Sequence, residues 1–185
     1  NHPHLADPDI LPEPEASAKL ELLIELVEDA IGSGHKILVF SQFVQMLKII
    51  RQVFDGMSLK YAYMDGKSKN RLQEVRRFEN DPELQLFLIS LKTGGTGLNL
   101  TAADTVILYD PWWNPMVENQ AIDRTHRIGQ TQKVQVYRLI TKGTVEEKIM
   151  NLQQHKLQLF DEVVSDTRKF LSNLTPEEIR DLFTY

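Results

Sequence analysis

The chain has 185 residues, of which 42% are hydrophobic and 25% charged, and it contains no cysteine. The lack of cysteine excludes disulfide scaffolds, thiolate zinc sites, iron–sulfur clusters and cysteine nucleophiles. A net charge of −5 argues against a protein that binds nucleic acid over most of its surface. A local basic groove can nevertheless exist on an acidic protein.

The predicted elements begin after an extended N-terminal segment. Residues 1–16 carry four of the eight prolines and little periodicity, so we expect a linker or arm there. From Ser17, apolar residues recur at helical spacing as far as Gly32, which predicts an amphipathic helix. Strands are then expected at 36–40, 59–63, 84–89, 105–109 and 134–140. Helical segments between them are expected at 42–54, 68–79 and 116–128.

Several of the predicted strands are almost continuously apolar, as in a sheet that is covered on both faces. The alternation of strands and helices predicts an α/β domain over residues 17–141, with a doubly wound, mostly parallel sheet and helices on both faces. Such sheets bind ligands at the carboxyl ends of their strands. Residues 142–185 should form a C-terminal helical appendage, with a long helix at 144–164 and a capping box at 175–178.

Two segments imitate nucleotide-binding loops. Gly66-Lys67-Ser68 follows a predicted strand, but the glycine that a phosphate-binding loop needs five places before Gly66 is Tyr61. Asp110 ends a strand as in a Walker B motif, but a proline follows it and not a second carboxylate. We therefore expect a turn and a helix N-cap at the first segment, and no complete nucleotide-hydrolysing site in this chain. The five histidines show no ligand spacing, and we assign no metal.

The richest polar segment is 119–130. In a helix, Gln120, Arg124 and Arg127 fall at i, i+4 and i+7, on one stripe beside an apolar one. Arginines held at the rim of a core suit an anionic ligand, above all phosphate. The alternative is an ion pair between Asp123 and Arg127 on a solvated helix face, worth at most a few tenths of a kcal/mol.

The order of several segments resembles the second lobe of the Swi/Snf-type branch of superfamily-two helicase-like ATPases. The segments are SQF at 41–43, MDGKS at 64–68 with Arg71 downstream, SLKTGGTGLNL at 90–100, AADTVILYDPWWNP at 102–115 and QAIDRTHRIGQ at 120–130. The match spans most of residues 36–137, and the DPWWNP to RTHRIGQ run is its most specific part. The resemblance implies a RecA-like fold, with ATP and duplex DNA bound between this lobe and the N-terminal ATPase lobe of the same polypeptide.

The resemblance also implies roles at the nucleotide. Arg124 and Arg127 resemble the arginine fingers that reach the γ-phosphate, and Gln120 resembles the glutamine that supports them. Gly97 and Asn99 are expected to face the nucleotide cleft. ATP with Mg²⁺ would be bound by the two-lobed parent and not tightly by this chain, so we expect the chain alone to be inactive.

Contacts to the DNA backbone are implied at the ends of the strands and in the glycine-rich segment. The residues are Ser41, Gln42, Lys67, Ser68, Arg71, Lys92, Thr93, Gly94, Gly95 and Trp113. Phosphate contacts position a protein without reading sequence, so we expect DNA binding with a steep salt dependence and little base preference. The alternatives are a flexible connection for the glycine-rich segment and simple packing for the tryptophans, which we favour for Trp112.

The long helix at 144–164 resembles the brace helix that crosses back toward the first lobe, and the alternative is an ordinary helix that covers the sheet. We expect the second motor lobe of an ATP-dependent double-stranded DNA translocase of the chromatin-remodelling type. One alternative is a non-catalytic DNA- or protein-binding α/β module, and another is a self-sufficient enzyme acting on a phosphorylated small molecule. No apolar run reaches the roughly 18 residues of a membrane span. The absence of cysteine fits a reducing intracellular setting, and we expect the isolated chain to be a monomer.

Overall fold

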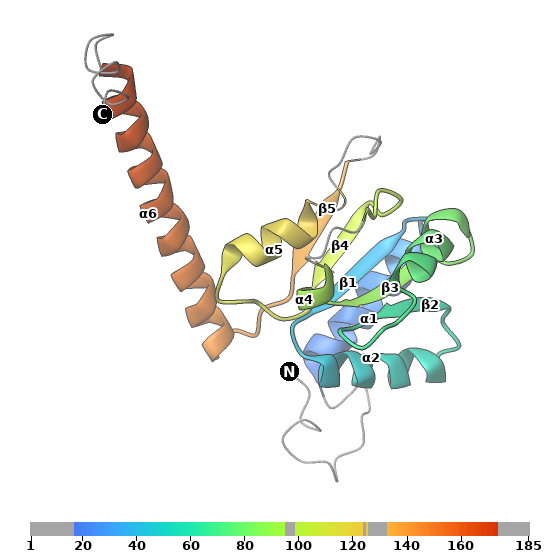
Figure 1. Cartoon of the computed structure of the whole chain (residues 1–185). Coiled ribbons are helices and arrows are strands. Elements are labelled where there is room, and N and C mark those ends of the chain that lie inside the picture. Colours follow the sequence, from blue (N-terminus) through green and yellow to red (C-terminus); the bar gives the residue numbers. More distant parts are fainter. Residues whose placement is uncertain (1–16, 95–98, 124, 126–132, 174–185) are drawn as a thin grey trace.

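The computed structural model describes residues 17–94, 99–123, 125 and 133–173, with residues 161–173 described as backbone only (Figure 1). The helices are α1 (Ala18–Gly32), α2 (Val44–Gly56), α3 (Arg71–Asn80), α4 (Leu91–Gly94), α5 (Pro115–Ile122) and α6 (Val145–Asn173). The strands are β1 (Ile37–Ser41), β2 (Tyr61–Met64), β3 (Leu86–Ser90), β4 (Thr105–Leu108) and β5 (Gln135–Arg138). Each of these strands overlaps a range predicted from the sequence.

The strands form one sheet in the order β2-β3-β1-β4-β5, and every neighbouring pair is parallel. Val39 at the centre of β1 lies opposite Leu88 on one side and Ile107 on the other. The predicted doubly wound α/β fold is therefore confirmed, and the sheet is wholly rather than mostly parallel. Because all strands run the same way, their carboxyl ends lie along a single edge of the sheet.

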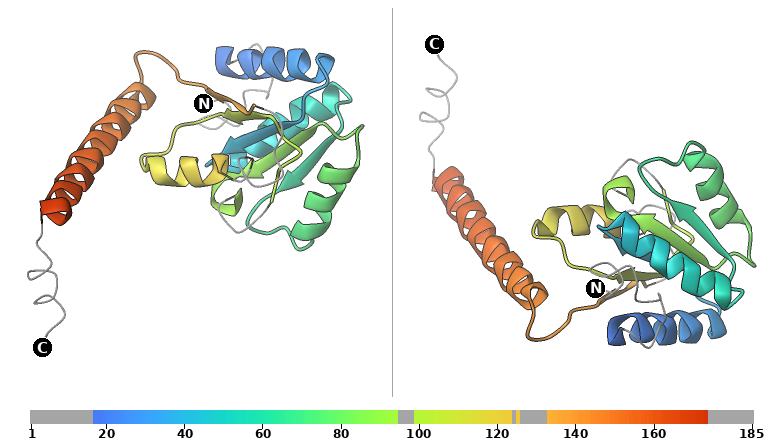
Figure 2. Two further views of the ribbon diagram at one scale, coloured as in Figure 1. Left: turned by 90° about the horizontal axis from the view of Figure 1, so that it is seen from above. Right: turned by 90° about the horizontal axis from the view of Figure 1, so that it is seen from below.

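Helices cover both faces of the sheet, as predicted. Ile37 and Val39 of β1 belong to a core cluster with the apolar sides of α1 and α2. Leu38 and Phe40 point to the other face and join a cluster with α3 and α5. Figure 2 shows α1 and α3 on opposite sides of the strands. The side-chain period of two along a strand explains this division, and burial on both faces explains why β1 is apolar almost throughout.

At the amino edge of the sheet, Lys36 joins the start of β1 to the end of α3, a contact that the sequence alone did not indicate. Lys36 donates from Nζ to the carbonyls of Phe78 and Asp81, the latter at 2.9 Å, at the C-terminal end of α3. Cations are favourable at this end of a helix because its last carbonyls have no partners within the helix. Burial lowers the pKa of Lys36, against the opposing effect of nearby carboxylates.

Helix α6 points away from the sheet in both views of Figure 2 and in Figure 1. The alternative of a helix that covers the sheet is therefore wrong, while the brace role stays a prediction. Its first turn is tied to α1 through Lys19 and Glu146, whose charged atoms lie 2.5 Å apart. Among the described residues, no helix is long and apolar enough to cross a membrane. The capping box expected at 175–178 lies outside the described residues, and the division at residues 16 and 141 stays a prediction.

Candidate functional site

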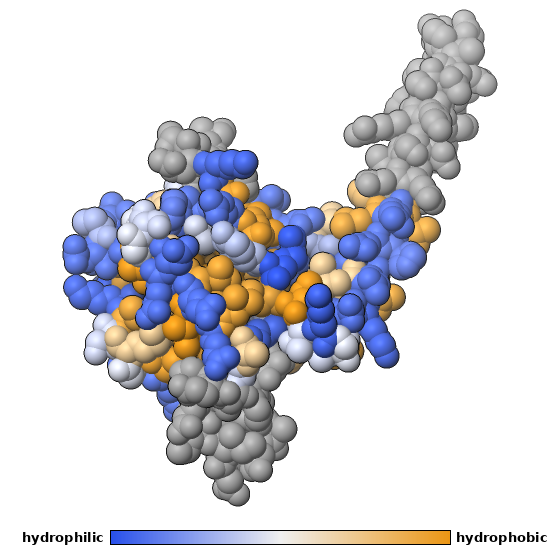
Figure 3. Space-filling model, turned by 180° about the vertical axis from the view of Figure 1, so that it is seen from behind, coloured by the Kyte–Doolittle hydropathy of each residue, from blue (hydrophilic) through white to orange (hydrophobic). Residues whose placement is uncertain are grey.

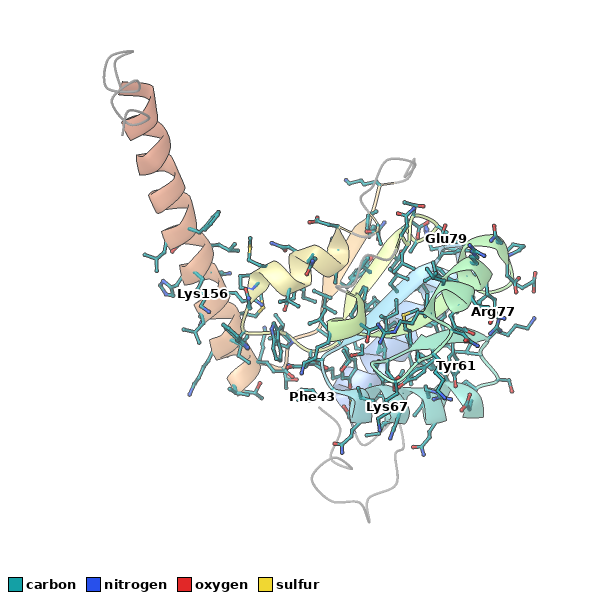
Figure 4. All side chains as sticks on the ribbon, viewed as in Figure 1. Phe43, Tyr61, Lys67, Arg77, Glu79 and Lys156 are labelled. Atoms are coloured by element: carbon teal, nitrogen blue, oxygen red, sulfur yellow. The ribbon has the colours of Figure 1, made fainter. Side chains whose placement is uncertain are left out.

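The carboxyl edge of the sheet gathers most of the described residues for which the sequence predicts DNA contacts. Ser41 ends β1, Lys67 lies in the loop after β2, Lys92 follows β3, and Trp113 lies in the loop after β4. Figure 4 shows Phe43 and Lys67 at this edge, beneath the strands. Parallel pairing brings these residues together although they lie far apart in the sequence.

A buried carboxylate organises the loop after β1. Asp110, which is 3% exposed, accepts a hydrogen bond from the Ser41 hydroxyl and another from the backbone N–H of Gln42 at 2.8 Å. Burial raises the pKa of Asp110 to about 6, although these two hydrogen bonds oppose the shift. The Gln42 side chain donates to the carbonyl of Pro111 at 2.9 Å. The Ser41 side chain is thus buried and hydrogen-bonded inside the protein, and Gln42 is the more exposed of the two residues.

The loop after β2 is a turn built on Asp65. Its carboxylate accepts the Lys67 amide at 2.9 Å and the Ser68 hydroxyl at 3.2 Å, while the Tyr63 hydroxyl donates to it at 3.0 Å. Burial alone would raise the pKa of Asp65, but these hydrogen bonds outweigh burial and hold the pKa below its ordinary value. In a phosphate-binding loop the Lys67 amide would face the phosphate. Here it faces Asp65, as the prediction of a turn requires.

The predicted N-cap at Ser68 is wrong. Helix α3 begins at Arg71, and Asn70 occupies the cap position. The Ser68 hydroxyl is engaged by Asp65, which leaves Ser68 in the turn before the helix. Arg71 instead folds back over the turn and donates to the carbonyl of Gly66 at 3.0 Å. Lys67 remains exposed at the tip of this turn.

The glycine-rich segment begins with the short helix α4, directly after β3. Lys92 is exposed on it, whereas Thr93 is 3% exposed. Asn99 is exposed where the described chain resumes. Gly95 and Gly97 lie outside the described residues, and Gly94 is described as backbone only. A small apolar pocket of about 100 Å³ opens at this edge, lined by Gln42, Leu91, Lys92, Trp112 and Val117.

The two adjacent tryptophans have different environments. Trp112 is half-buried and packs against the core cluster shared with α5, as expected. Trp113 is 52% exposed, and its ring centroid lies 6.1 Å from that of Trp112. The ammonium of Lys156, on α6, lies 4.3 Å from the centroid of the Trp113 ring. Simple packing therefore describes Trp112 but not Trp113.

Glu118 and Gln153 hold the tryptophan loop, and sequence reasoning missed both. Glu118 is 1% exposed and accepts the Trp112 amide at 2.7 Å. Gln153 is 4% exposed and donates to the Trp112 carbonyl and to Glu118. One signal was present: Glu118 precedes buried Ala121 by three residues, so a carboxylate occupies the apolar side of the helix.

Of the stripe predicted at positions 120, 124 and 127, the structure describes only Gln120. Helix α5 ends at Ile122, not at residue 128 as expected. Thr125 donates from both its amide, at 2.9 Å, and its hydroxyl, at 2.6 Å, to the Ile122 carbonyl, which closes the helix end. Gln120 is exposed on the last turn of α5. Arg124 and Arg127 lie outside the described residues, so their roles stay predictions that rest on the resemblance.

Comparison with known proteins gives consistent matches over most of the chain. Residues 18–129 match the family described as Helicase conserved C-terminal domain. The chain is 42% identical over 171 residues to a protein of Mycoplasma pneumoniae described as an uncharacterized ATP-dependent helicase, covering 91% of this chain and 17% of that protein. It is 45% identical over 150 residues to the chromatin-remodeling ATPase INO80 of Mycosarcoma maydis, covering 80% of this chain and 8% of that protein.

A solved structure agrees with the sequence matches. The Sulfolobus solfataricus SWI2/SNF2 ATPase core in complex with dsDNA is 36% identical, with a TM-score of 0.72, and the match covers 97% of this chain and 38% of that one. The chain thus spans less than a fifth of the length of the two curated relatives. What these proteins share with it is one lobe.

Proposed function

Because this chain belongs to the helicase conserved C-terminal domain family and is the C-terminal RecA-like lobe of a Swi2/Snf2-type ATPase, we propose that it is the second motor lobe of a double-stranded DNA translocase. The observation that carries the proposal is the single carboxyl edge of the parallel sheet, which collects Gln42, Lys67, Lys92 and Trp113. These side chains offer amide, ammonium and indole groups, a set suited to a sugar-phosphate backbone.

Duplex DNA is the proposed ligand of this edge. Lys67 and Lys92 are exposed and lie just after two adjacent strands of the sheet, Lys67 in the turn after β2 and Lys92 on α4 after β3. Arg71 stiffens the loop that carries Lys67 through its bond to Gly66. Each phosphate neutralised by such a cation releases condensed counterions, so affinity for B-DNA should fall steeply with salt and depend little on base sequence.

ATP with Mg²⁺ is the proposed cofactor of the two-lobed protein. Asp110 does not suit the metal, because it is 3% exposed and engaged by Ser41 and Gln42. The exposed polar side chains of Asn99 and Gln120 suit contacts to a nucleotide that is held mainly by the other lobe. When bound, ATP supplies the phosphoryl group that is hydrolysed, and Mg²⁺ neutralises its charge.

Arg124 and Arg127 are the proposed arginine fingers, with Gln120 as their support. An arginine supplied across a cleft stabilises charge that spreads over the phosphoryl oxygens, and it is worth roughly 10³ to 10⁵ in rate. Such a group acts only when two lobes close, which couples hydrolysis to lobe movement. The chain alone should accordingly be inactive.

The test is Arg127→Ala in the full-length protein. Duplex-stimulated ATP hydrolysis should fall by a factor of roughly 10³ or more, while DNA affinity stays within about twofold. Lys133→Ala, an exposed cation just before β5, is the matched control and should leave turnover nearly unchanged. Unchanged turnover in Arg127→Ala would refute the finger assignment. A full-length protein that binds duplex but hydrolyses no ATP would favour the non-catalytic binding module.

A further inference from the structure

We propose that Trp113 and Lys156 form one composite contact for the backbone of duplex DNA, which extends the DNA-binding edge of the sheet onto helix α6. This inference rests on the proposed function and assigns a DNA contact to the appendage as well as to the lobe. Lys156 lies on the part of α6 nearest the domain (Figure 4). It lies in the helix at 144–164, for which the resemblance implies a brace but no DNA contact.

The pair presents a cation and an apolar ring side by side. The Lys156 ammonium lies 4.3 Å from the centroid of the Trp113 ring, and Trp113 is 52% exposed. Among the side chains that the structure describes, none places a carboxylate within ion-pair distance of Lys156. The ring orients the ammonium electrostatically without consuming its N–H donors. Those donors remain available to an anion.

Buried hydrogen bonds next to Trp113 and Lys156 fix the position of α6 relative to the tryptophan loop. Gln153 lies three residues before Lys156 on α6, and its buried amide donates to the Trp112 carbonyl and, at 2.9 Å, to Glu118. Glu118 in turn accepts the Trp112 amide at 2.7 Å. Both backbone polar groups of Trp112 are thus held by side chains, so α6 cannot slide along the tryptophan loop without breaking buried hydrogen bonds. A contact built across two elements needs such a fixed register.

The surface beside the pair is apolar. A groove of about 170 Å³ between the start of α5 and α6 is lined by Asn114, Pro115, Met116, Lys156, Leu157 and Phe160. Figure 3 shows hydrophobic residues mixed with hydrophilic ones along the described part of α6. Deoxyribose is largely apolar and alternates with anionic phosphate along a strand. An indole next to an ammonium matches that alternation, with the ring against the sugar and the lysine at the phosphate.

The composite contact continues a row of cations. Lys67 and Lys92 are exposed at the carboxyl edge of the sheet, and Trp113 follows β4 at the same edge. Lys156 adds a further positive charge beyond Trp113. A DNA strand that lies along the carboxyl edge of the sheet would therefore reach α6 after it passes the tryptophan loop.

The experiment measures the salt dependence of duplex binding by the full-length protein, by fluorescence anisotropy on a short labelled duplex of mixed sequence. If Lys156 neutralises one phosphate, Lys156→Gln should reduce the slope of log K against log salt by about 0.9. Lys156→Arg, which keeps the charge, should keep the wild-type slope. Lys60→Gln is the matched control, because Lys60 lies just before β2, at the opposite edge of the sheet, and should leave the slope unchanged.

A double-mutant cycle tests whether the two residues act together. The loss in affinity for Trp113→Ala with Lys156→Gln should be smaller than the sum of the two single losses, since each change disrupts the same contact. A wild-type slope in Lys156→Gln, or strictly additive losses, would overturn the composite contact while the proposed function stands. A wild-type protein that does not bind duplex would overturn both.

Discussion

The carboxylate of Glu118 accepts the backbone N–H of Trp112 at 2.7 Å, which ties helix α5 to the loop that carries both tryptophans. The same carboxylate accepts Gln153 of α6 at 2.9 Å and Arg138 of β5 at 3.2 Å. Its side chain is 1% exposed, so water does not replace a lost partner. One buried charge therefore joins the loop to a helix, a strand and the appendage.

Replacement of Glu118 by alanine should lower the free energy of unfolding by about 3 kcal/mol, because three donors lose their acceptor and Arg138 loses its charge partner. Urea denaturation followed by tryptophan fluorescence measures the change. Glu83→Ala is the control, since Glu83 is 78% exposed in its side chain and lies 3.9 Å from Lys60. That variant should lose less than about 0.5 kcal/mol. Equal effects of the two substitutions would contradict the role of Glu118.

The ion pair between Lys19 and Glu146 should show strong coupling, because both side chains are buried, at 6% and 10% exposure. Burial alone would raise the pKa of Glu146, but hydrogen bonds from Lys19 and from the Thr141 amide outweigh it and hold the pKa below the ordinary value. Lys19→Met leaves the carboxylate without its cation and should cost about 3–5 kcal/mol. Combining it with Glu146→Gln should restore most of the loss, because the amide oxygen can still accept from Thr141.

A double-mutant cycle by chemical denaturation gives the coupling energy for Lys19 and Glu146. The exposed pair of Lys60 and Glu83 provides the comparison, with a coupling energy expected below about 0.5 kcal/mol. Additive losses for Lys19→Met and Glu146→Gln would show that the buried pair does not stabilise the junction of α1 and α6.

Asp110 should make stability depend on pH. Burial raises its folded-state pKa to about 6, above that of an ordinary carboxyl group, with Lys19 and Glu146 as the charged groups that also act on it. A raised pKa means that the contribution to stability is complete below the unfolded-state pKa and is lost as pH rises through about 6. The loss is on the order of 3 kcal/mol, which follows from the difference between a folded-state pKa of about 6 and the pKa of an ordinary carboxyl group.

Asp110→Asn removes this titration while keeping an oxygen that accepts from the backbone N–H of Gln42. The difference in free energy of unfolding, Asp110→Asn minus wild type, should increase between pH 4 and pH 7 and then remain constant. Taking the difference cancels the titration of groups common to both proteins. A difference that stays constant from pH 4 to pH 8 would contradict the raised pKa.

The sheet was predictable because buried parallel strands leave a direct signal. Leu86–Ser90 and Thr105–Leu108 are buried throughout, and each appears in the sequence as a run of apolar residues between turns. The packing partners on the two faces then follow from alternation along each strand. This part of the fold depends on local composition, which one sequence displays.

Helix ends were less predictable because they depend on competing hydrogen bonds. Ser68 has the side chain of a good N-cap, but Asp65 engages its hydroxyl three residues earlier. Thr125 resembles an interior helix residue, yet its bonds to the Ile122 carbonyl close α5. In both cases the predicted helix is longer than the observed one, because the sequence pattern extends before Arg71 at α3 and beyond Ile122 at α5.

The contacts behind the tryptophan loop were not predictable from spacing. Gln153 and Glu118 are separated by 35 residues, and neither position predicted for the long C-terminal helix, a brace toward the first lobe or a cover for the sheet, places Gln153 against the tryptophan loop. The resemblance of the DPWWNP segment drew attention to Trp113, whereas the residues that fix its position come from α5 and α6. Long-range polar contacts of this kind leave no periodic signal, apart from a polar residue on an apolar face.

Tyr63→Phe should weaken DNA binding through the loop that carries Lys67. The Tyr63 hydroxyl donates to Asp65 at 3.0 Å, and burial raises its pKa to about 12, so the phenol remains protonated and able to donate at physiological pH. Its ring lies 4.4 Å from the Arg51 guanidinium, a contact that phenylalanine preserves. Removal of the hydroxyl should cost about 1 kcal/mol of stability and loosen the turn around Asp65.

Duplex affinity of the full-length Tyr63→Phe protein should fall several-fold at low salt with no change in the salt slope, because Lys67 keeps its charge but loses its fixed position. Tyr61→Phe is the matched control, since the Tyr61 hydroxyl donates to Asp55 at 2.6 Å and does not touch the turn. That variant should lose comparable stability and keep its affinity. Equal affinities for the two variants would mean that Asp65 holds the loop without help from Tyr63.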